Sequence, residues 1–147
     1  VHFDLAEHWH IYWQNPGASG LAPEFTWGLP EGLVAGEIQW PSPERISMGG
    51  LVNYGYEEEV TFIVPMTAAS SLQSSGELRL KLDLFFLICE EACLPAEAVL
   101  ELTLPVAASA EEVPRAAAFE EARASQPETD SDWSNQSLRS HLKARSD

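Results

Sequence analysis

Basic residues are scarce in this chain of 147 residues, and long apolar runs are missing. Lys and Arg number 8 against 23 Asp and Glu, so the formal net charge is -15. A surface this acidic repels nucleic acid and anionic lipid, which excludes both as partners. No stretch reaches the roughly 18 apolar residues that a spanning helix needs, so the sequence predicts no membrane span.

The chain also lacks the basic segment and apolar run that together mark a signal peptide. It opens on VHFDLAEHWHIYW, which already has the character of a strand. We therefore expect the sequence to be part of a longer protein whose upstream portion is not included. The length suffices for one domain with a real core, and a hydrophobic content of 45% argues against disorder of the whole chain.

Alternating polarity predicts strands in two places. In HWHIYW, residues 8–13, apolar side chains take one face and the other face carries His8, His10 and Tyr12. In ELRLKLDLFFLI, residues 77–88, leucines line one face. The opposite face is charged and then turns apolar at Phe85 and Leu87, which places Cys89 next on that outward face.

Shorter strand candidates lie at residues 24–30, 37–41, 60–65 and 98–106, whereas the segments 14–20 and 42–51 have the Pro and Gly of loops. About seven short strands with frequent turn residues predict an all-β fold, an antiparallel β-sandwich. From Ala107 the composition favours a helix over residues 107–125 and then a polar segment. We thus predict one domain at residues 1–106, followed by a helical and polar tail at 107–147 that is a linker or the start of a following segment.

The only two cysteines, Cys89 and Cys93, lie in FFLICEEACLP, and three uses are open for them. A structural disulfide closing a loop of about five residues adds only about 2 kcal/mol, so it is a poor staple. Two thiolates with His8 and His10 would make a tetrahedral metal site, but the second spaced ligand pair of zinc sites is missing. A cuprous ion on the two sulfurs is a further alternative. For the two histidines, an ordinary solvated or half-buried strand face is the preferred interpretation.

The third use is thiol–disulfide exchange, which needs an accessible sulfur, a second thiol that resolves the mixed disulfide, and apolar surface for docking. A short loop at the edge of a sheet keeps both sulfurs near solvent, and Phe85 and Leu87 supply the apolar surface. Glu90 and Glu91 stand between the sulfurs and disfavour a thiolate. Such a pair suits passing electrons on when docked to a better activated partner.

Four stretches, HWHIYWQNPGASG, IQWPSPERI, LVNYGYEEEVTFIVPM and FFLICEEACLPAEAVLELTLPV, resemble the N-terminal periplasmic domain of the DsbD-type membrane thiol reductases, in particular the ScsB-like branch. The resemblance covers most of residues 1–106 and implies an immunoglobulin-like fold. It also implies an electron route from cytoplasmic thioredoxin, through a transmembrane domain and a periplasmic thioredoxin-like domain, to this domain. The domain would then reduce disulfides of periplasmic proteins, including isomerases and the cytochrome c maturation route.

The resemblance assigns the catalytic pair to Cys89 and Cys93. A cap loop that shields the cysteines in the family matches residues 43–50 here, which makes Ile46 or Met48 the lid side chain, although the aromatic cap residue of the family is absent. Two family tyrosines fall at His10 and Tyr12, and only Tyr12 matches in type. His10 would be either a local proton acceptor or a packing residue. The cysteines are also closer together than in the best-studied members, which is expected to change the potential of the disulfide.

We therefore interpret the chain as the periplasmic domain of an inner-membrane protein from a Gram-negative bacterium, with neither cofactor nor metal. Its expected partners are a thioredoxin-like domain of the same or a partner protein and the disulfide-bonded proteins of the periplasm. Cys93 is expected to attack, because Cys89 ends a rigid strand. The alternative is a non-catalytic immunoglobulin-like module, for binding or copper handling, whose disulfide is structural.

Overall fold

The computed structural model describes residues 1–70, 72, 76–106 and 116–127. These residues form ten strands and one helix: β1 (His2–Asp4), β2 (His10–Gly17), β3 (Glu24–Gly28), β4 (Leu33–Ala35), β5 (Glu44–Met48), β6 (Leu51–Glu57), β7 (Glu59–Thr61), β8 (Met66–Ala68), β9 (Gly76–Cys89), β10 (Cys93–Val106) and α1 (Ala116–Ala124). Every strand pairing is antiparallel. The predicted immunoglobulin-like antiparallel β-sandwich is confirmed.

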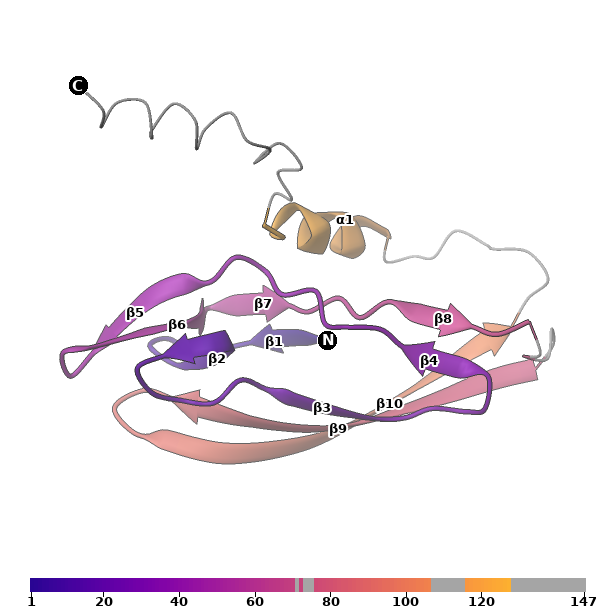
Figure 1. The fold of residues 1–147 in the computed structure, drawn as a ribbon, viewed down its shortest axis with the longest axis horizontal. Coiled ribbons are helices and arrows are strands. Elements are labelled where there is room, and N and C mark those ends of the chain that lie inside the picture. Colours follow the sequence, from indigo (N-terminus) through magenta and orange to yellow (C-terminus); the bar gives the residue numbers. More distant parts are fainter. Residues whose placement is uncertain (71, 73–75, 107–115, 128–147) are drawn as a thin grey trace, which may run out of the picture.

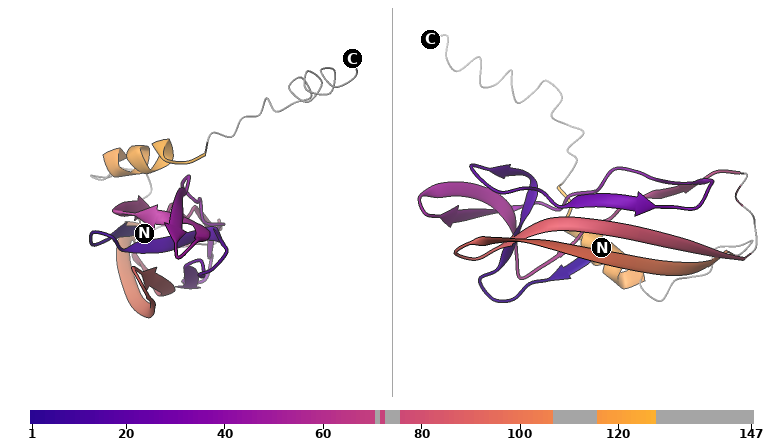
Figure 2. Two further views of the ribbon diagram at one scale, coloured as in Figure 1. Left: turned by 90° about the vertical axis from the view of Figure 1, so that its left-hand side faces the viewer. Right: turned by 90° about the horizontal axis from the view of Figure 1, so that it is seen from below.

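The largest sheet has the strand order β10-β9-β2-β6-β5, and β3 pairs with β9 beside this path. Two further sheets, β1-β7 and β4-β8, have two strands each. Figure 1 shows β3, β9 and β10 along one side of the sandwich and β5 to β8 along the other. The long hairpin of β9 and β10 runs the length of the molecule in both views of its long axis (Figures 1 and 2).

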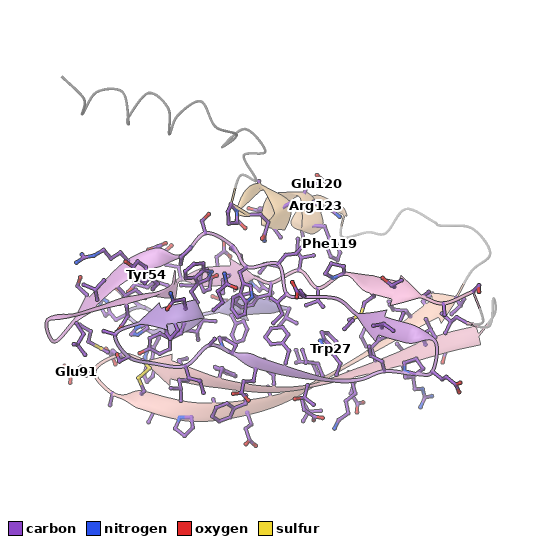
Figure 3. All side chains as sticks on the ribbon, viewed as in Figure 1. Trp27, Tyr54, Glu91, Phe119, Glu120 and Arg123 are labelled. Atoms are coloured by element: carbon purple, nitrogen blue, oxygen red, sulfur yellow. A yellow bond between two sulfur atoms is a disulfide. The ribbon has the colours of Figure 1, made fainter. Side chains whose placement is uncertain are left out.

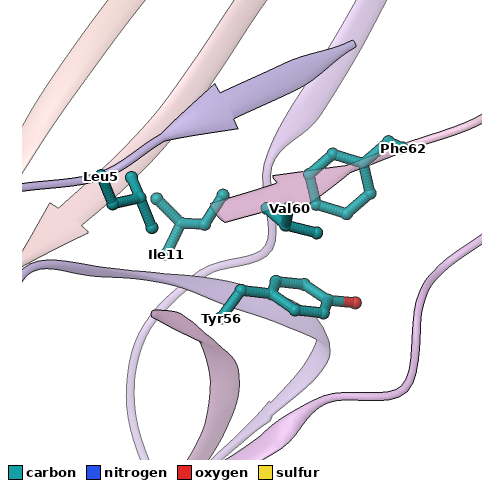
Figure 4. Packing of buried hydrophobic residues seen from close by; sticks show 5 residues of the cluster. All are labelled: Leu5, Ile11, Tyr56, Val60 and Phe62. Atoms are coloured by element: carbon teal, nitrogen blue, oxygen red, sulfur yellow. The ribbon is translucent and has the colours of Figure 1, made fainter. Parts of the chain in front are cut away.

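The core lies between these layers and centres on Phe62, which is 1% exposed. Figure 4 shows the buried cluster around it, made of Leu5, Ile11, Tyr56, Val60 and Phe62. The Phe62 ring packs edge-on against four other aromatic rings at centroid distances of 5.1–5.8 Å, those of Phe3, Phe25, Trp40 and Tyr56. Such pairs add about 0.5–1.5 kcal/mol each beyond the burial of their area. This aromatic cluster includes neither cysteine.

Strand β9 has the alternation that its sequence predicts. Leu80, Leu82 and Leu84 are buried, and Lys81, which lies between the first two, is exposed. Its partner β10 is longer than the predicted strand at 98–106, because it begins at Cys93. Since β10 is an edge strand, its inward-facing Leu100, Leu102 and Leu104 remain partly exposed.

The predicted loop at residues 42–51 is wrong, because β5 and β6 form a hairpin there. Met48 pairs with Leu51, and the two residues between them are Gly49 and Gly50 with φ of 59° and 83°. Positive φ at both central residues is the geometry of a type I′ turn, whose twist matches that of the flanking strands. The glycine pair therefore joins two strands and does not loosen a loop.

Three other boundaries also differ from the prediction. Strand β2 begins at His10, whereas His8 is exposed in a turn with φ of 72°, so His8 and His10 share no strand face. At its other end β2 continues to Gly17 past a register shift, where the sequence predicted a loop. The strand predicted at 37–41 is a single bridge between Gln39 and Ile63, since the prolines that follow cannot donate to a ladder.

Helix α1 lies within the helix predicted for residues 107–125, although residues 107–115 are outside the described residues. It rests on the sandwich through Ala122, which is 4% exposed, and the Ser42 amide donates to the Ser125 carbonyl at 3.0 Å. Of the polar segment predicted after the helix, residues 128–147 lie outside the described residues. Among the residues described, no helix has the length and apolar character that crossing a membrane requires.

Candidate functional site: a cross-strand disulfide

The two cysteines face each other across the β9–β10 hairpin and form a disulfide. Cys89 is the last residue of β9 and Cys93 is the first of β10, with an S–S distance of 2.06 Å and a Cα–Cα distance of 4.1 Å. The loop between them is closed by a hydrogen bond from the Glu90 amide to the Ala92 carbonyl. Figure 3 shows the disulfide beside Glu91, at the hairpin end of the molecule.

The two cysteine residues differ in their exposure to solvent. Cys89 is 0% exposed, whereas Cys93 is an exposed residue. The expectation that the hairpin keeps both sulfurs near solvent is therefore wrong for Cys89. The physical reason is that β9 is an inner strand at this point, with β10 on one side and β2 on the other. A reagent from solvent meets Cys93 first.

Tyr12 lies directly against the disulfide. Its hydroxyl is 3.4 Å from the sulfur of Cys93, and its side chain is fully buried. Burial raises the pKa of Tyr12, and the Ser19 side chain offsets part of this shift. The hydroxyl therefore stays protonated at neutral pH and is available to donate to a sulfur with negative charge.

The loop after β2 folds back over Tyr12 and closes the site from the other side. Gly20 has a φ of 97°, and a Cβ at this position would lie only 2.3 Å from the Tyr12 ring. The side-chain oxygen Oδ1 of Asn53 anchors this loop by accepting from the backbone amide and the hydroxyl of Ser19, at 3.0 and 3.1 Å. Asn53 is 0% exposed, so the anchor is shielded from water. We did not predict Asn53, Ser19 or Gly20 as site residues from the sequence.

His10 is the second predicted residue that the fold brings to the cysteines. It pairs with Cys89 in the register of β2 and β9, and its ring lies 5.3 Å from that of Tyr12 in an edge-to-face arrangement. His10 is 2% exposed, and within the described part of the chain its buried Nε2 atom has no hydrogen-bond partner. Burial lowers the pKa of His10, and the carboxylate of Glu57 offsets part of the shift. The imidazole is therefore predominantly neutral near pH 7.

Apolar side chains extend the site along the hairpin. Leu87 pairs with Pro95, directly next to the disulfide on the same face, and Phe85 follows two residues further along β9. Leu87 and Phe85 are half-buried, and Pro95 is exposed. These side chains form an apolar patch next to the disulfide, and its use by a partner for docking stays a prediction.

The residues predicted to form the lid lie further away in the sheet. Ile46 and Met48 are on β5, which β6 and β2 separate from β9. Ile46 is 8% exposed, whereas Met48 is half-buried near the turn. Figures 1 and 2 show that the β5–β6 turn and the β9–β10 turn point to the same end of the long axis. The β5–β6 hairpin therefore extends toward the same end of the molecule as the disulfide, and its role as a lid stays a prediction.

Within the described part of the chain, no group of three or more His, Cys, Asp or Glu side chains is arranged to hold a metal ion. The tetrahedral set of Cys89, Cys93, His8 and His10 does not assemble, because His8 stands in an exposed turn and both sulfurs are bonded to each other.

Comparisons with known proteins agree with this geometry. The family model for the N-terminal part of the thiol:disulfide interchange protein DsbD matches residues 1–105. The crystal structure of the N-terminal periplasmic domain of ScsB from Proteus mirabilis is similar with a TM-score of 0.62 and 26% sequence identity, over 86% of this chain and 47% of that chain. The present chain thus spans about half the length of that solved relative. No curated protein matches it significantly.

Proposed function

Since this chain belongs to the family of the N-terminal domain of the thiol:disulfide interchange protein DsbD, we propose that it is a protein-disulfide reductase domain. It receives electrons from a thioredoxin-like domain of the same or a partner protein and passes them to disulfides of substrate proteins. The likeness to a periplasmic domain supports a location in the periplasm, in a parent protein embedded in the inner membrane of a Gram-negative bacterium. We propose that its substrates include disulfide isomerases and proteins of the cytochrome c maturation route.

The observation that carries this proposal is the disulfide between an exposed cysteine residue and a buried one. In the reduced domain, the Cys93 thiolate attacks a substrate disulfide and forms a mixed disulfide, and one substrate sulfur leaves as a thiolate. The Cys89 thiolate then attacks the Cys93 sulfur, which restores the intramolecular disulfide and releases the second substrate thiolate. The exposure of Cys93 allows the first step, and the burial of Cys89 keeps the resolving thiol from reacting with solvent oxidants.

The return of electrons uses the same sulfur. A thiolate of the thioredoxin-like partner attacks the Cys93 sulfur, and Cys89 leaves with the electron pair. The second thiolate of the partner then attacks the first, which closes the partner's disulfide and releases Cys93 as a thiolate. The apolar patch of Phe85, Leu87 and Pro95 supports docking in both directions, because each partner must bring a sulfur within bonding distance of Cys93. The β5–β6 hairpin with Ile46 and Met48 is the candidate lid over this approach.

An equilibrium titration against glutathione tests the proposal, with thiol alkylation read by mass spectrometry. We expect a reduction potential between about -180 and -270 mV, because exchanging disulfides lie above the range of structural ones. A potential below about -300 mV would contradict the proposal and favour a binding or copper-handling module with a structural disulfide.

A further inference from the structure

The strand register aligns four side chains in one row across the sheet. Glu57 on β6 pairs with His10 on β2, His10 pairs with Cys89 on β9, and Cys89 pairs with Cys93 on β10. Residues directly opposite each other in antiparallel strands project to the same face, with their Cβ atoms about 4.5–5.5 Å apart. The order carboxylate, imidazole, thiol, thiol is therefore built into the sheet by residues that are far apart in the sequence.

The two outer residues of this row are exposed to solvent, and the two inner residues are buried. Glu57 and Cys93 are exposed, whereas His10 and Cys89 are buried. Burial separates Cys89 from solvent, yet its thiol must lose its proton before it can resolve a mixed disulfide on Cys93. The Nε2 atom of His10 is buried and has no hydrogen-bond partner among the residues that the structure describes, so it offers a position for a proton.

Other titratable groups near this position are less suited to the task. Tyr12, on the same strand as His10, has a pKa raised by burial and is a donor rather than an acceptor at neutral pH. Glu90 and Glu91 are exposed in the hairpin loop. The outer end of the row borders an acidic cleft, which is lined by Glu7, His8, Glu44, Glu57 and Glu58. This negative surround favours a positive charge on His10 once the proton has moved.

We propose that His10 is the base that takes the proton from the Cys89 thiol during resolution of the mixed disulfide, and that Glu57 is a positioning residue that orients and stabilises the imidazole. This inference rests on the proposed exchange function. The neutral imidazole accepts the Cys89 proton, and the Cys89 thiolate attacks the Cys93 sulfur. The Cys93–substrate bond breaks, and the substrate sulfur leaves with the electron pair. The imidazolium next to Glu57 then returns its proton to solvent.

Rapid-quench mass spectrometry of the reduced full chain with oxidised glutathione separates the two steps. Formation of the glutathione adduct on Cys93 reports the attack, and its decay to the intramolecular disulfide with release of glutathione reports the resolution. In His10→Gln we expect resolution near pH 7 to slow by about 100-fold, the usual contribution of a general base. Adduct formation should stay within about twofold of wild type, because the exposed Cys93 attacks oxidised glutathione without help from His10.

The pH profile separates a base from a packing residue. Resolution in the wild type should level off above the pKa of His10, whereas in His10→Gln it should rise by about tenfold per pH unit as thiolate alone limits the rate. Glu57→Gln should slow resolution by about threefold, because an exposed charge pair is screened by solvent. His8→Gln is the matched control, since His8 is exposed in the preceding turn, and it should behave as wild type.

A His10→Gln protein that folds and resolves the adduct at the wild-type rate and with the wild-type pH profile would overturn this assignment. If His10→Gln fails to fold, Glu57→Gln decides, because Glu57 is exposed and its replacement leaves the core intact: resolution at the wild-type rate there would also overturn the assignment. A wild-type protein that forms no adduct at all would instead overturn the proposed exchange function. The two failures are thus distinguishable.

Discussion

At the scale of single residues, the site depends on the difference between its two cysteines. They are neighbours in the sequence and partners in the register, yet only Cys93 faces solvent, because Cys89 lies between β10 and β2. Thiol reactivity depends on access as well as on the fraction of thiolate. The same hairpin therefore holds one sulfur that meets partners and one that resolves the product.

Single cysteine variants test this difference directly. In Cys89→Ala, the remaining Cys93 should react with iodoacetamide at a rate close to that of a free thiol and should trap partner proteins as mixed disulfides. In Cys93→Ala, the remaining Cys89 should react at least about tenfold more slowly, because it is buried. Both rates should become equal in concentrated urea, which serves as the control. Equal rates in the native proteins would contradict the assignment of Cys93 as the attacking sulfur.

Some residues of the site could be predicted from the sequence, because local patterns or the family resemblance point to them. The cysteine pair is visible from its spacing, and the resemblance to the family drew attention to His10 and Tyr12. Asn53 and Glu57 were missed, because their importance comes from the pairing of β6 with β2, and no local pattern encodes a register between distant strands. A polar residue such as Asn53 within an otherwise apolar strand is the one signal that was available.

At the scale of elements, turns decide how closely the site is packed. The Gly49–Gly50 turn lets β5 and β6 form a hairpin, and the loop after β2 seals Tyr12 through Gly20. The apolar strands were predicted well, because alternation is a local signal. The prediction of a flexible loop at the glycine pair was wrong. The alternating residues on both sides of that pair were evidence for a hairpin.

Two alanine substitutions separate backbone conformation from packing at the site. Both Gly20 and Gly49 have positive φ, but a Cβ at Gly20 would overlap the Tyr12 ring, whereas no atom lies within 4 Å of one at Gly49. Gly49→Ala should lower the free energy of unfolding by about 1 kcal/mol through backbone strain alone. Gly20→Ala should cost at least about 1 kcal/mol more, because the loop or the ring must move.

Urea denaturation measures both losses, and alkylation of Cys89 in a Cys93→Ala background reports on the seal. That alkylation should accelerate with Gly20→Ala and should stay unchanged with Gly49→Ala. If the two substitutions have equal effects on stability and on alkylation, the loop does not seal the disulfide.

At the scale of the whole molecule, the core and the disulfide are separate structures. The aromatic cluster around Phe62 lies between the layers, whereas the disulfide lies on the opposite face of the sheet, near one end of the long hairpin. The strand order places both edges of the central strand β9 in ladders, so its position does not depend on the bond that it carries. A domain that opens and closes a disulfide in each cycle requires this independence, because its reduced form must remain folded.

Reduction should therefore weaken the domain without unfolding it. The disulfide closes a loop of about five residues, which corresponds to about 2 kcal/mol of chain entropy, against the 5–15 kcal/mol typical of a domain. We expect a reductant to lower the melting temperature by about 10 °C and to leave the near-ultraviolet circular dichroism spectrum at 25 °C largely intact. The double variant Cys89→Ala/Cys93→Ala should melt close to the reduced wild type and should not respond to the reductant. If reduction abolishes the spectrum at 25 °C, the disulfide is a structural staple, and the sandwich cannot serve as an electron carrier.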